Sequence, residues 1–518
     1  MDRDEARFAQ SSKQMLQSND FIVPKFQDEI RAKKPIIIYW LQALSAKVFG
    51  EKTISSYRLP SLLGFMLSIY FTYKFSFLLR KTSNDQFYAV LSALFLSSSP
   101  LFFFEAHLAK VDSFLLCIVI LQQMILWNIY ENRNKNQKNS WYFYFWVLLS
   151  LGILLKGPIS PAISFLTIIS LLILDKNFSW LKQLCFLKGI CISILIISPW
   201  AILVSIYTNG EFLEIAIKND FLLKLQSGQE SHGSPPGTYL LIICLLFWPS
   251  SIFLSYIPIL GKKLIKEDAF KFCISWILGY WIMIEIIPTK LPHYILPIFP
   301  AIALLMSQSL SIQYKNFALR KNILNNLFII FVSISGICLI FLLVYSVSKL
   351  TFKNIYIPLL SLIFILSIFI FVQYKTYLWK KNNNIREIII IPFCGIIINF
   401  IIISGILSNL DKIHVSKTLY NKVNSLNFTP NPIAISGYHE PSSVFYLGKD
   451  LLLLNPKEAA LFLIEASNGL SIVEQKGEKD FLDVINSFDK KVDKLGIING
   501  VNISKGENIK LILYKLKK

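Results

Sequence analysis

The feature that most constrains this chain is a series of long apolar stretches, each close to the roughly 20 residues that a helix needs to cross a bilayer. Hydrophobic residues make up 54% of its 518 residues and charged residues only 16%, whereas soluble domains are about 25% charged. This composition excludes a soluble enzyme, a secreted disulfide scaffold and a disordered chain. We predict an all-α polytopic membrane protein with twelve candidate spans, at residues 58–79, 86–104, 111–130, 141–156, 158–174, 186–207, 237–260, 270–288, 293–312, 323–346, 355–374 and 386–408.

The loops between these spans carry unequal charge. One alternating set of short loops holds eighteen basic residues, whereas the other set holds six once the first loop is left aside. Because cytoplasmic loops are enriched in Lys and Arg, we place the basic set in the cytoplasm. The net charge of +20 is then mostly a topology signal and does not indicate nucleic acid. Residues 1–57, residues 208–236 and the tail from about 409 are expected on the outer face.

The two ends of the chain differ from the apolar middle. In residues 1–57, apolar side chains are spaced as on two amphipathic surface helices. The tail 409–518 has regular charges and short β-prone runs, so we predict a small α/β domain outside the membrane. Those runs are Ile433–Ser436, Ser443–Leu447 and Lys510–Leu516. The seven cysteines lie in or beside apolar spans without a C-x-x-C pair, so we expect neither disulfides nor structural zinc.

Polar residues gather at the outer ends of the predicted spans. In the first loop, the acidic pair Asp4 and Glu5 and the Lys/Arg cluster at 31–34 offer a place for a phosphate beside a general base, although a solvated loop on lipid headgroups fits the same composition. The segment 105–112 holds two carboxylates, a lysine and a histidine. Each charge would cost about 2.5–3.5 kcal/mol at mid-bilayer, so we expect this segment at the outer surface or against a polar cavity.

Three further outer segments carry Lys or His. Lys156 lies at the mouth of a tight helical hairpin, where a single lysine is more often a snorkelling anchor than a ligand. Residues 229–237 are rich in turn residues, and residues 288–294 lie at another outer boundary. Lys, His and carboxylate groups converging on one face indicate a site for an anionic, membrane-resident substrate.

At these positions the sequence resembles a known family. Its motifs, in the same order, are those of the aminoarabinose transferase / protein O-mannosyltransferase-like glycosyltransferases, and the resemblance covers residues 1 to about 310. The matching motifs are Asp4-Glu5-Ala6-Arg7-Phe8, Lys34-Pro35, Arg58-Leu59-Pro60, Lys156-Gly157-Pro158 and Lys290-Leu291-Pro292-His293-Tyr294. A second pattern is similar to alphaproteobacterial members: Glu105-Ala106-His107, Lys33-Lys34-Pro35 and Glu230-Ser231-His232-Gly233.

The resemblance implies a GT-C fold in the bacterial inner membrane, in three regions. These are a periplasmic first loop (1–57) with the catalytic motif, a transmembrane glycosyltransferase bundle (58–408) and a C-terminal periplasmic domain (409–518). It implies a sugar donor on a polyprenyl phosphate and an acceptor such as lipid A, lipopolysaccharide or another envelope glycan. Asp4 is implied as the catalytic carboxylate, Glu5 as its catalytic neighbour, and Arg7 and Lys34 as phosphate ligands. The implied further substrate contacts are Arg58, Lys110, Asp112, Lys156, Glu230, His232, Lys290, His293 and Tyr294.

Two departures from the family pattern stand out. The family has one more helix ahead of the first motif, which this chain reaches at its fourth residue, so we expect the family's first helix to be missing here, either because the true start lies upstream or because this is a truncated form. The residue before Lys34-Pro35 is Lys33, where aminoarabinose transferases have an acidic residue that helps to hold a metal. We therefore predict no metal ligands and no firm cofactor, although a divalent metal stays possible.

In the mechanism that follows, the polyprenyl phosphate leaves while Arg7 and Lys34 neutralise its charge, and Asp4 accepts the proton of the attacking acceptor hydroxyl, with inversion. Three alternatives stay open. The acceptor is a Ser or Thr of a protein, or the chain is a transporter or flippase of a lipid-linked glycan, or it is a membrane scaffold. A transporter is expected to have charges at mid-span and inverted repeats, and neither stands out here.

Overall fold

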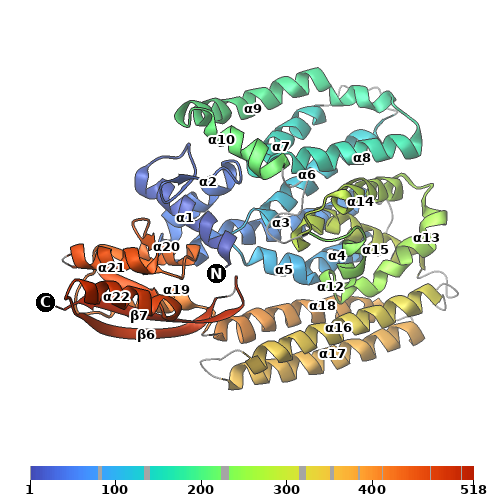
Figure 1. Cartoon of the computed structure of the whole chain (residues 1–518). Helices are drawn as coiled ribbons and strands as arrows, with labels where there is room; N and C mark the ends of the chain where they lie inside the picture. The colour runs from blue at the N-terminus through green and yellow to red at the C-terminus, as the bar shows by residue number, and fades with distance from the viewer. Residues whose placement is uncertain are drawn as a thin grey trace.

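The computed structural model describes residues 2–79, 85–133, 140–222, 233–313, 323–349, 355–382, 385–410, 412–466, 468–502 and 504–517. Apolar helices pack into one large bundle with a continuous hydrophobic core (Figure 1). The bundle helices are α3 (Ile54–Leu79), α4 (Asp85–Ser98), α5 (Pro100–Ala106), α6 (Asp112–Glu131), α7 (Trp141–Lys156), α8 (Ile159–Asp175), α9 (Phe186–Tyr207), α12 (Thr238–Leu246), α13 (Tyr256–Leu264), α14 (Asp268–Ile286), α15 (Phe299–Gln313), α16 (Ile323–Lys349), α17 (Tyr356–Asn382) and α18 (Ile385–Ile401). Short 3-10, π or α turns join or extend them: η1 (Ser179–Leu184), α10 (Glu211–Glu214), η2 (Ile215–Leu222), η3 (Ser250–Ser255), η4 (Pro292–Ile298), η6 (Ile402–Ile406) and η7 (Leu407–Asn409).

The chain is a multi-pass membrane protein, but the predicted number of spans was too high. In the described ranges, eight helices are long and apolar enough to cross a membrane, or nine if α4 and α5, bent by 69°, form one span. Helices α7 and α8 have 16 and 17 residues, so they are about 24–26 Å long and fall short of a hydrocarbon core of about 30 Å. The predicted span 237–260 is broken into α12, η3 and α13 around Pro249, because proline cannot continue helical hydrogen bonding.

The first segment of the chain contains two helices, α1 (Arg3–Ser18) and α2 (Ile37–Phe49), as the spacing of apolar residues predicted. A two-stranded hairpin, β1 (Lys25–Phe26) and β2 (Glu29–Ile30), lies between them. Helix α1 begins after Asp2, whose backbone N–H donates to Oε2 of Glu5 at 3.3 Å. The Asp2 N–H has no hydrogen-bond acceptor within the helix, and the Glu5 side chain supplies one. Glu5 therefore stabilises the first turn of α1.

The C-terminal region folds around a five-stranded mixed sheet of order β4-β3-β5-β7-β6. β3 is parallel to β4 and β5, whereas β7 is antiparallel to β5 and β6. Separate hydrophobic clusters fill its two faces. The elements are α19 (Val415–Asn424), β3 (Ile433–Ser436), α20 (Pro441–Leu447), β4 (Leu452–Leu454), α21 (Pro456–Glu465), β5 (Leu470–Glu474), η8 (Gln475–Gly477), α22 (Glu478–Ser487), β6 (Val492–Asn502) and β7 (Glu507–Leu516).

Two of the three predicted β-prone runs are strands, and one is not. Ile433–Ser436 is β3 and Lys510–Leu516 lies in β7, but Ser443–Leu447 belongs to helix α20. Pro441 at the first helical position presets the backbone for a helix, and this effect outweighs the strand preference of the apolar residues that follow.

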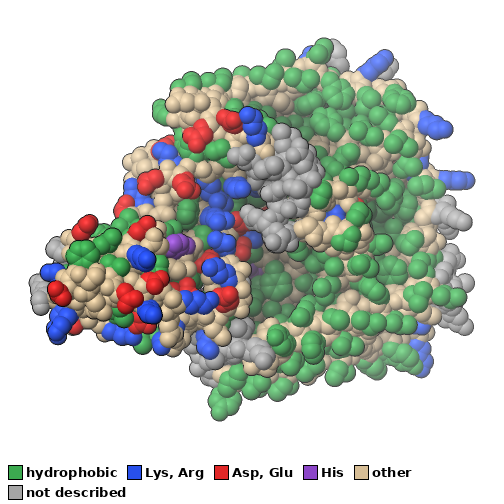
Figure 2. Space-filling view, in the orientation of Figure 1, with side chains coloured by type: hydrophobic (Ala, Val, Ile, Leu, Met, Phe, Trp, Pro, Cys, Tyr) green, Lys and Arg blue, Asp and Glu red, His purple; other side chains and the backbone are tan. Residues whose placement is uncertain are grey.

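The C-terminal domain packs against the first segment at one end of the bundle, on the left of Figure 1. Lys13 Nζ on α1 donates to the carbonyl oxygen of Phe445 on α20 at 2.9 Å. Gln27 Nε2 donates to the carbonyl oxygens of Lys449 and Leu451 at 2.9 and 2.8 Å. Hydrophobic side chains cover the visible bundle surface, whereas charged side chains gather over these two regions (Figure 2). Charged side chains are thus densest at this end, although further Lys and Arg side chains lie at the opposite end of the bundle (Figure 2).

Candidate active site

A bidentate ion pair anchors the start of α1 to the first bundle helix. Arg58 on α3 donates from Nε to Glu5 Oε1 at 2.6 Å and from Nη2 to Oε2 at 3.0 Å. The backbone N–H of Ala109 donates to the same Oε1 at 3.0 Å, and Glu5 is fully buried. With these bonds the Glu5 carboxylate is already saturated, so its contacts are those of a residue that positions the first turn of α1.

The loop between α5 and α6 is held from two sides. Gln42 on α2 accepts a hydrogen bond from Ser12 Oγ at 2.8 Å and donates to the carbonyl oxygen of Ala109 at 3.0 Å. Ser61 Oγ on α3 donates to the carbonyl oxygen of Lys110 at 2.7 Å. The backbone on both sides of Lys110 is therefore fixed by α1, α2 and α3, which places its side chain at the mouth of the bundle.

Two ion pairs form within this mouth. Lys110 Nζ lies 2.7 Å from Asp2 Oδ2, and Lys156 Nζ at the end of α7 pairs with Asp112 at the start of α6. Burial alone would lower the pKa of Lys110, but the carboxylates of Glu105 and Asp2 outweigh burial and raise it. Burial would raise the pKa of Asp2, but the charge and hydrogen bond of Lys110 bring it below its ordinary value.

His293 lies at the centre of these charges. Its Nδ1 is 3.9 Å from Glu105 Oε1, and Asp112, Lys156, Lys110 and Lys34 all lie close enough to act on it electrostatically. These groups come from α5, α6, the end of α7, the loop before α2 and η4. The structure thus brings together five side chains that were predicted from separate motifs or clusters.

Tyr294 belongs to the same cluster. The Lys156 ammonium lies 5.8 Å from the centre of the Tyr294 ring, and the rings of His293 and Tyr294 meet edge to face at 5.0 Å. The aromatic face supplements the Asp112 carboxylate in holding the Lys156 charge.

Glu105 is the residue that sequence reasoning left out of the site. It is 8% exposed, and its Oε2 is buried without a hydrogen-bond partner among the described residues. Buried polar atoms in native proteins nearly always have a partner, so an unpaired carboxylate oxygen among these charged side chains makes Glu105 a candidate site residue. The signal in the sequence was its place in the Glu105-Ala106-His107 pattern, from which no role was assigned.

Asp4 and Arg7 occupy the open side of the site. Both lie in the first two turns of α1, and Arg7 Nη1 is 3.5 Å from Asp4 Oδ1. The Asp4 side chain is 60% exposed and that of Arg7 31% exposed. Asp4 therefore differs from Glu5, because its carboxylate is exposed to solvent whereas that of Glu5 is fully buried.

Lys290 is placed differently from the other predicted contacts. Its ammonium donates to the carbonyl oxygens of Ile284, Glu285 and Ile287 at 3.1, 2.8 and 2.9 Å, and the side chain is 2% exposed. A cation in this position satisfies the open carbonyls at the end of α14 and complements the helix dipole. Two other predicted contacts, Glu230 and His232, lie outside the described residues.

The donor set does not fit a metal ion. Across the described ranges, no group of three His, Cys, Asp or Glu side chains gathers as a metal would require. Lys33, a cation, stands before Lys34-Pro35. We therefore derive no step through a metal.

Comparisons with known proteins fit this arrangement. Residues 33–203 match the family model described as dolichyl-phosphate-mannose-protein mannosyltransferase. An uncharacterised protein of Aquifex aeolicus is 29% identical over 312 residues, which cover 60% of this chain and 59% of that protein. The undecaprenyl phosphate-alpha-4-amino-4-deoxy-L-arabinose arabinosyl transferase of Yersinia pestis (strain Pestoides F) is 26% identical over 310 residues, which cover 59% of this chain and 54% of that protein.

The fold matches that of ArnT from Cupriavidus metallidurans, solved with bound undecaprenyl phosphate. The TM-score is 0.74 at 14% identity, with 98% of this chain and 93% of that chain covered. The chain is thus a multi-pass membrane protein with an ArnT-like GT-C fold. The chain is similar in sequence to this family model and to these relatives, and similar in fold to ArnT. The aligned regions span less than two thirds of either curated relative's length.

Proposed function

We propose that this protein is an integral membrane glycosyltransferase that moves a sugar from a polyprenyl-phosphate donor to lipid A, lipopolysaccharide or another envelope acceptor. The observation that carries the proposal is the convergence of Lys34, Lys110 and Lys156 on His293, beside the helix that bears Asp4. Two of these three lysines pair with Asp2 and Asp112, and the cluster as a whole places several ammonium groups at one end of an apolar bundle, where they suit a phosphate carried on a lipid. The activity for which the Yersinia pestis relative is named and the undecaprenyl phosphate in the ArnT structure support the same donor class.

The proposed chemistry is a single displacement. The bond between the anomeric carbon and the phosphate oxygen breaks, and Arg7 and Lys34 neutralise the charge that develops on the departing phosphate. A new bond forms from the acceptor oxygen to the opposite face of that carbon, which inverts it. Asp4 takes the acceptor's proton, and its exposed carboxylate is open to an approaching acceptor. Glu5 holds the first turn of α1 through Arg58, so it acts as a positioning residue.

The proposed orientation puts this site on the periplasmic face of the inner membrane, together with residues 1–57 and 409–518 and opposite the basic loops. The loop charges support it. The contacts of Lys13 and Gln27 with the C-terminal domain mean that both end regions share one side.

Mass spectrometry of lipid A and core oligosaccharide tests the proposal. A strain lacking the gene is compared with strains complemented by the wild type or by Asp4→Asn. We expect one sugar mass to disappear on deletion and to return with the wild type but not with Asp4→Asn. Full restoration by Asp4→Asn would contradict the role of Asp4.

A second acceptor class is favoured by one observation, the match of residues 33–203 to a protein mannosyltransferase family model. In that case the sugar is transferred to Ser or Thr of an exported protein. Sugar lost from glycoproteins, with lipopolysaccharide unchanged in the deletion strain, would identify this variant. A transporter would move a lipid-linked glycan without forming any new glycosidic bond.

A further inference from the structure

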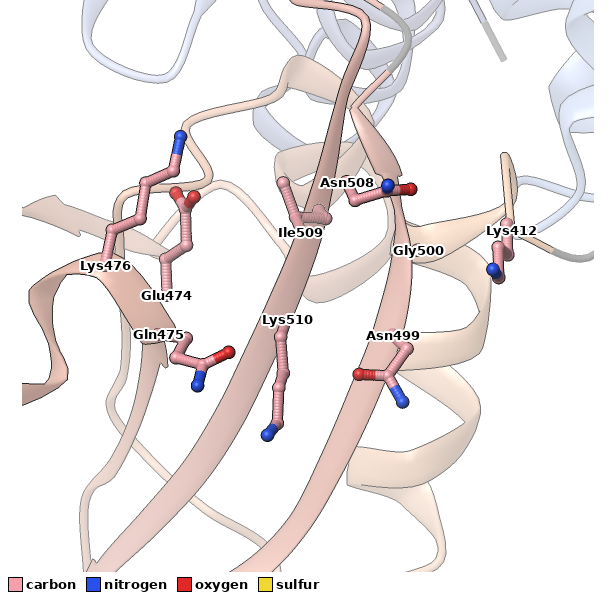
Figure 3. A pocket seen from close by; sticks show the side chains of 9 residues that line it. All are labelled: Lys412, Glu474, Gln475, Lys476, Asn499, Gly500, Asn508, Ile509 and Lys510. Atoms are coloured by element: carbon pink, nitrogen blue, oxygen red, sulfur yellow. The ribbon is translucent and has the colours of Figure 1, made fainter. Parts of the chain in front are cut away.

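A polar groove lies on the C-terminal domain, away from the cluster around His293. It encloses about 440 Å³ beside β7, between the end of β5 and the middle of β6 (Figure 3). Three lysines, Lys412, Lys476 and Lys510, one carboxylate, Glu474, and three amide side chains, Gln475, Asn499 and Asn508, line it. No step of the proposed sugar transfer uses these residues.

The groove lies close to the membrane boundary. The last candidate span ends at Asn409, and Lys412 follows three residues later. Three residues of extended chain cover at most about 11 Å, so the backbone of Lys412 stays within that distance of the end of the span. The backbone N–H of Val501 on β6 donates to the carbonyl oxygen of Lys412 at 2.8 Å, which ties the sheet to this connection.

The same groove lies close to the active-site helix. Asn499 and Asn508 flank the tip of the β6–β7 hairpin, where Ser504 Oγ donates to Glu440. Glu440 Oε2 lies in turn 3.4 Å from Arg3 Nε, next to Asp4 on α1. The hairpin therefore runs from the groove to the first turn of the catalytic helix.

The groove sets three lysines against one lining carboxylate, Glu474, so its charges favour an anion. Lys476 pairs with Glu507 at 2.5 Å, but within the described part of the chain neither Lys412 nor Lys510 has a carboxylate within ion-pair distance. Lysine ammonium groups bind phosphates as point charges. Side-chain amides both donate and accept hydrogen bonds, which matches the hydroxyl groups of a sugar.

We infer that this groove binds the phosphorylated sugar headgroup of the acceptor glycolipid and holds it beside α1. Lys412 and Lys510 contact the phosphate, and Asn499 and Asn508 contact the sugar hydroxyls. The inference rests on the proposed function, because it gives the acceptor a second point of attachment outside the bundle. A lipid-borne headgroup fits better than a soluble sugar phosphate, because the groove lies at the membrane boundary.

Native mass spectrometry of the full-length protein tests this inference. The purified protein is titrated with lipid A, with phosphatidylglycerol and with undecaprenyl phosphate. Soluble glucosamine 1-phosphate serves as a competitor of lipid A. The groove variant is Lys412→Glu with Lys510→Glu, and Lys412→Gln with Lys510→Gln is the milder pair if the first unfolds. The matched control is Lys457→Glu with Lys479→Glu, two exposed lysines of the same domain outside the groove.

We expect the groove variant to weaken lipid A binding about tenfold, which equals about 1.4 kcal/mol, and the control pair to leave it unchanged. Asn499→Leu with Asn508→Leu is expected to weaken lipid A but not phosphatidylglycerol. Glucosamine 1-phosphate is expected to displace lipid A only at far higher concentration than lipid A itself requires.

Three results would overturn the inference. The first is equal lipid A affinity in the groove variant and the wild type. The second is an equal loss for phosphatidylglycerol, which would make the groove a general anionic-lipid contact. The third is tighter binding of soluble glucosamine 1-phosphate than of lipid A, which would make the ligand a soluble sugar phosphate. The titration with undecaprenyl phosphate tests the proposed donor and not the groove. If this lipid did not bind the wild type, the proposed donor would be contradicted, but the lipid A measurements on the groove would still be valid.

Discussion

The guanidinium of Arg58 on α3 donates hydrogen bonds to both carboxylate oxygens of Glu5 on α1, with donor–acceptor distances of 2.6 and 3.0 Å. The two residues are 53 positions apart in the sequence, and the carboxylate is fully buried. Bidentate pairing fixes direction as well as distance. This pair helps to orient the first turn of α1, and with it Asp4, together with the Asp2–Lys110 and Arg3–Glu440 ion pairs.

Breaking this pair is expected to destabilise the protein. Glu5→Ala leaves the Arg58 charge without its partner and the Ala109 N–H without its acceptor. Because the Arg58 side chain is 36% exposed, we expect a loss of about 1–3 kcal/mol rather than the larger value for a wholly buried pair. Thermal unfolding in detergent checks this, with the exposed Glu29→Gln as control. Unchanged unfolding of Glu5→Ala would contradict it.

The Lys156–Asp112 pair is buried on both sides, with side chains 10% and 7% exposed. Removing either partner leaves a buried charge unpaired, whereas removing both does not. We therefore expect Asp112→Asn and Lys156→Met each to unfold at lower temperature than the double variant. A double-mutant cycle measures the coupling, and additive effects would show that the two charges do not stabilise each other.

The Asp2–Lys110 pair gives a pH dependence. The pKa of Asp2 lies below its ordinary value of 3.8, so its stabilising contribution is present above that pH and is lost as the pH falls through the lowered pKa. Asp2→Asn is expected to cost about 0.5–1 kcal/mol at pH 7, since the side chain is 43% exposed, and nothing in strong acid. Unfolding temperatures of wild type and variant should therefore converge on acidification. A constant difference would contradict the assignment.

Replacing Glu105 is expected to lower sugar-transfer activity without lowering the stability of the fold. Its Oε2 has no partner in the described structure, so Glu105→Gln removes a buried charge without breaking a hydrogen bond to that oxygen. We expect sugar transfer to fall at least tenfold while the unfolding temperature stays the same or rises. Retained transfer with a lowered unfolding temperature would mean that Glu105 serves the fold alone.

Replacing Lys290 is expected to lower the stability of the fold with little effect on ligand binding. Lys290→Met leaves three carbonyl oxygens at the end of α14 without their donor, so we expect a loss of about 2 kcal/mol or more in stability. Undecaprenyl phosphate affinity, measured on the fraction that folds, should change less than twofold. A selective loss of that affinity in a stable variant would restore Lys290 to the predicted substrate contacts.

Local patterns predicted much of this fold, and long-range packing decided the rest. The apolar spacing located α1 and α2, and the tight hairpin at Lys156 is present. The bend at Pro100 and the break near Pro249 were missed, because total apolar length conceals where a helix turns. The gathering of charges around His293 was expected in outline. The saturation of Glu5 and of Lys290 was not, because it depends on backbone groups of Ala109 and the α14 end that no motif encodes.

The bond from Lys13 to Phe445 joins residues 432 positions apart. During synthesis, α1 leaves the ribosome first and its neighbour α20 nearly last. The contacts between α1, the helix that bears Asp4, and α20 therefore cannot form until almost the entire chain has been translated. A prematurely terminated product would contain every residue of the Asp4 motif and yet lack α20, the helix against which α1 packs. The architecture thus makes a complete polypeptide a condition for a complete site.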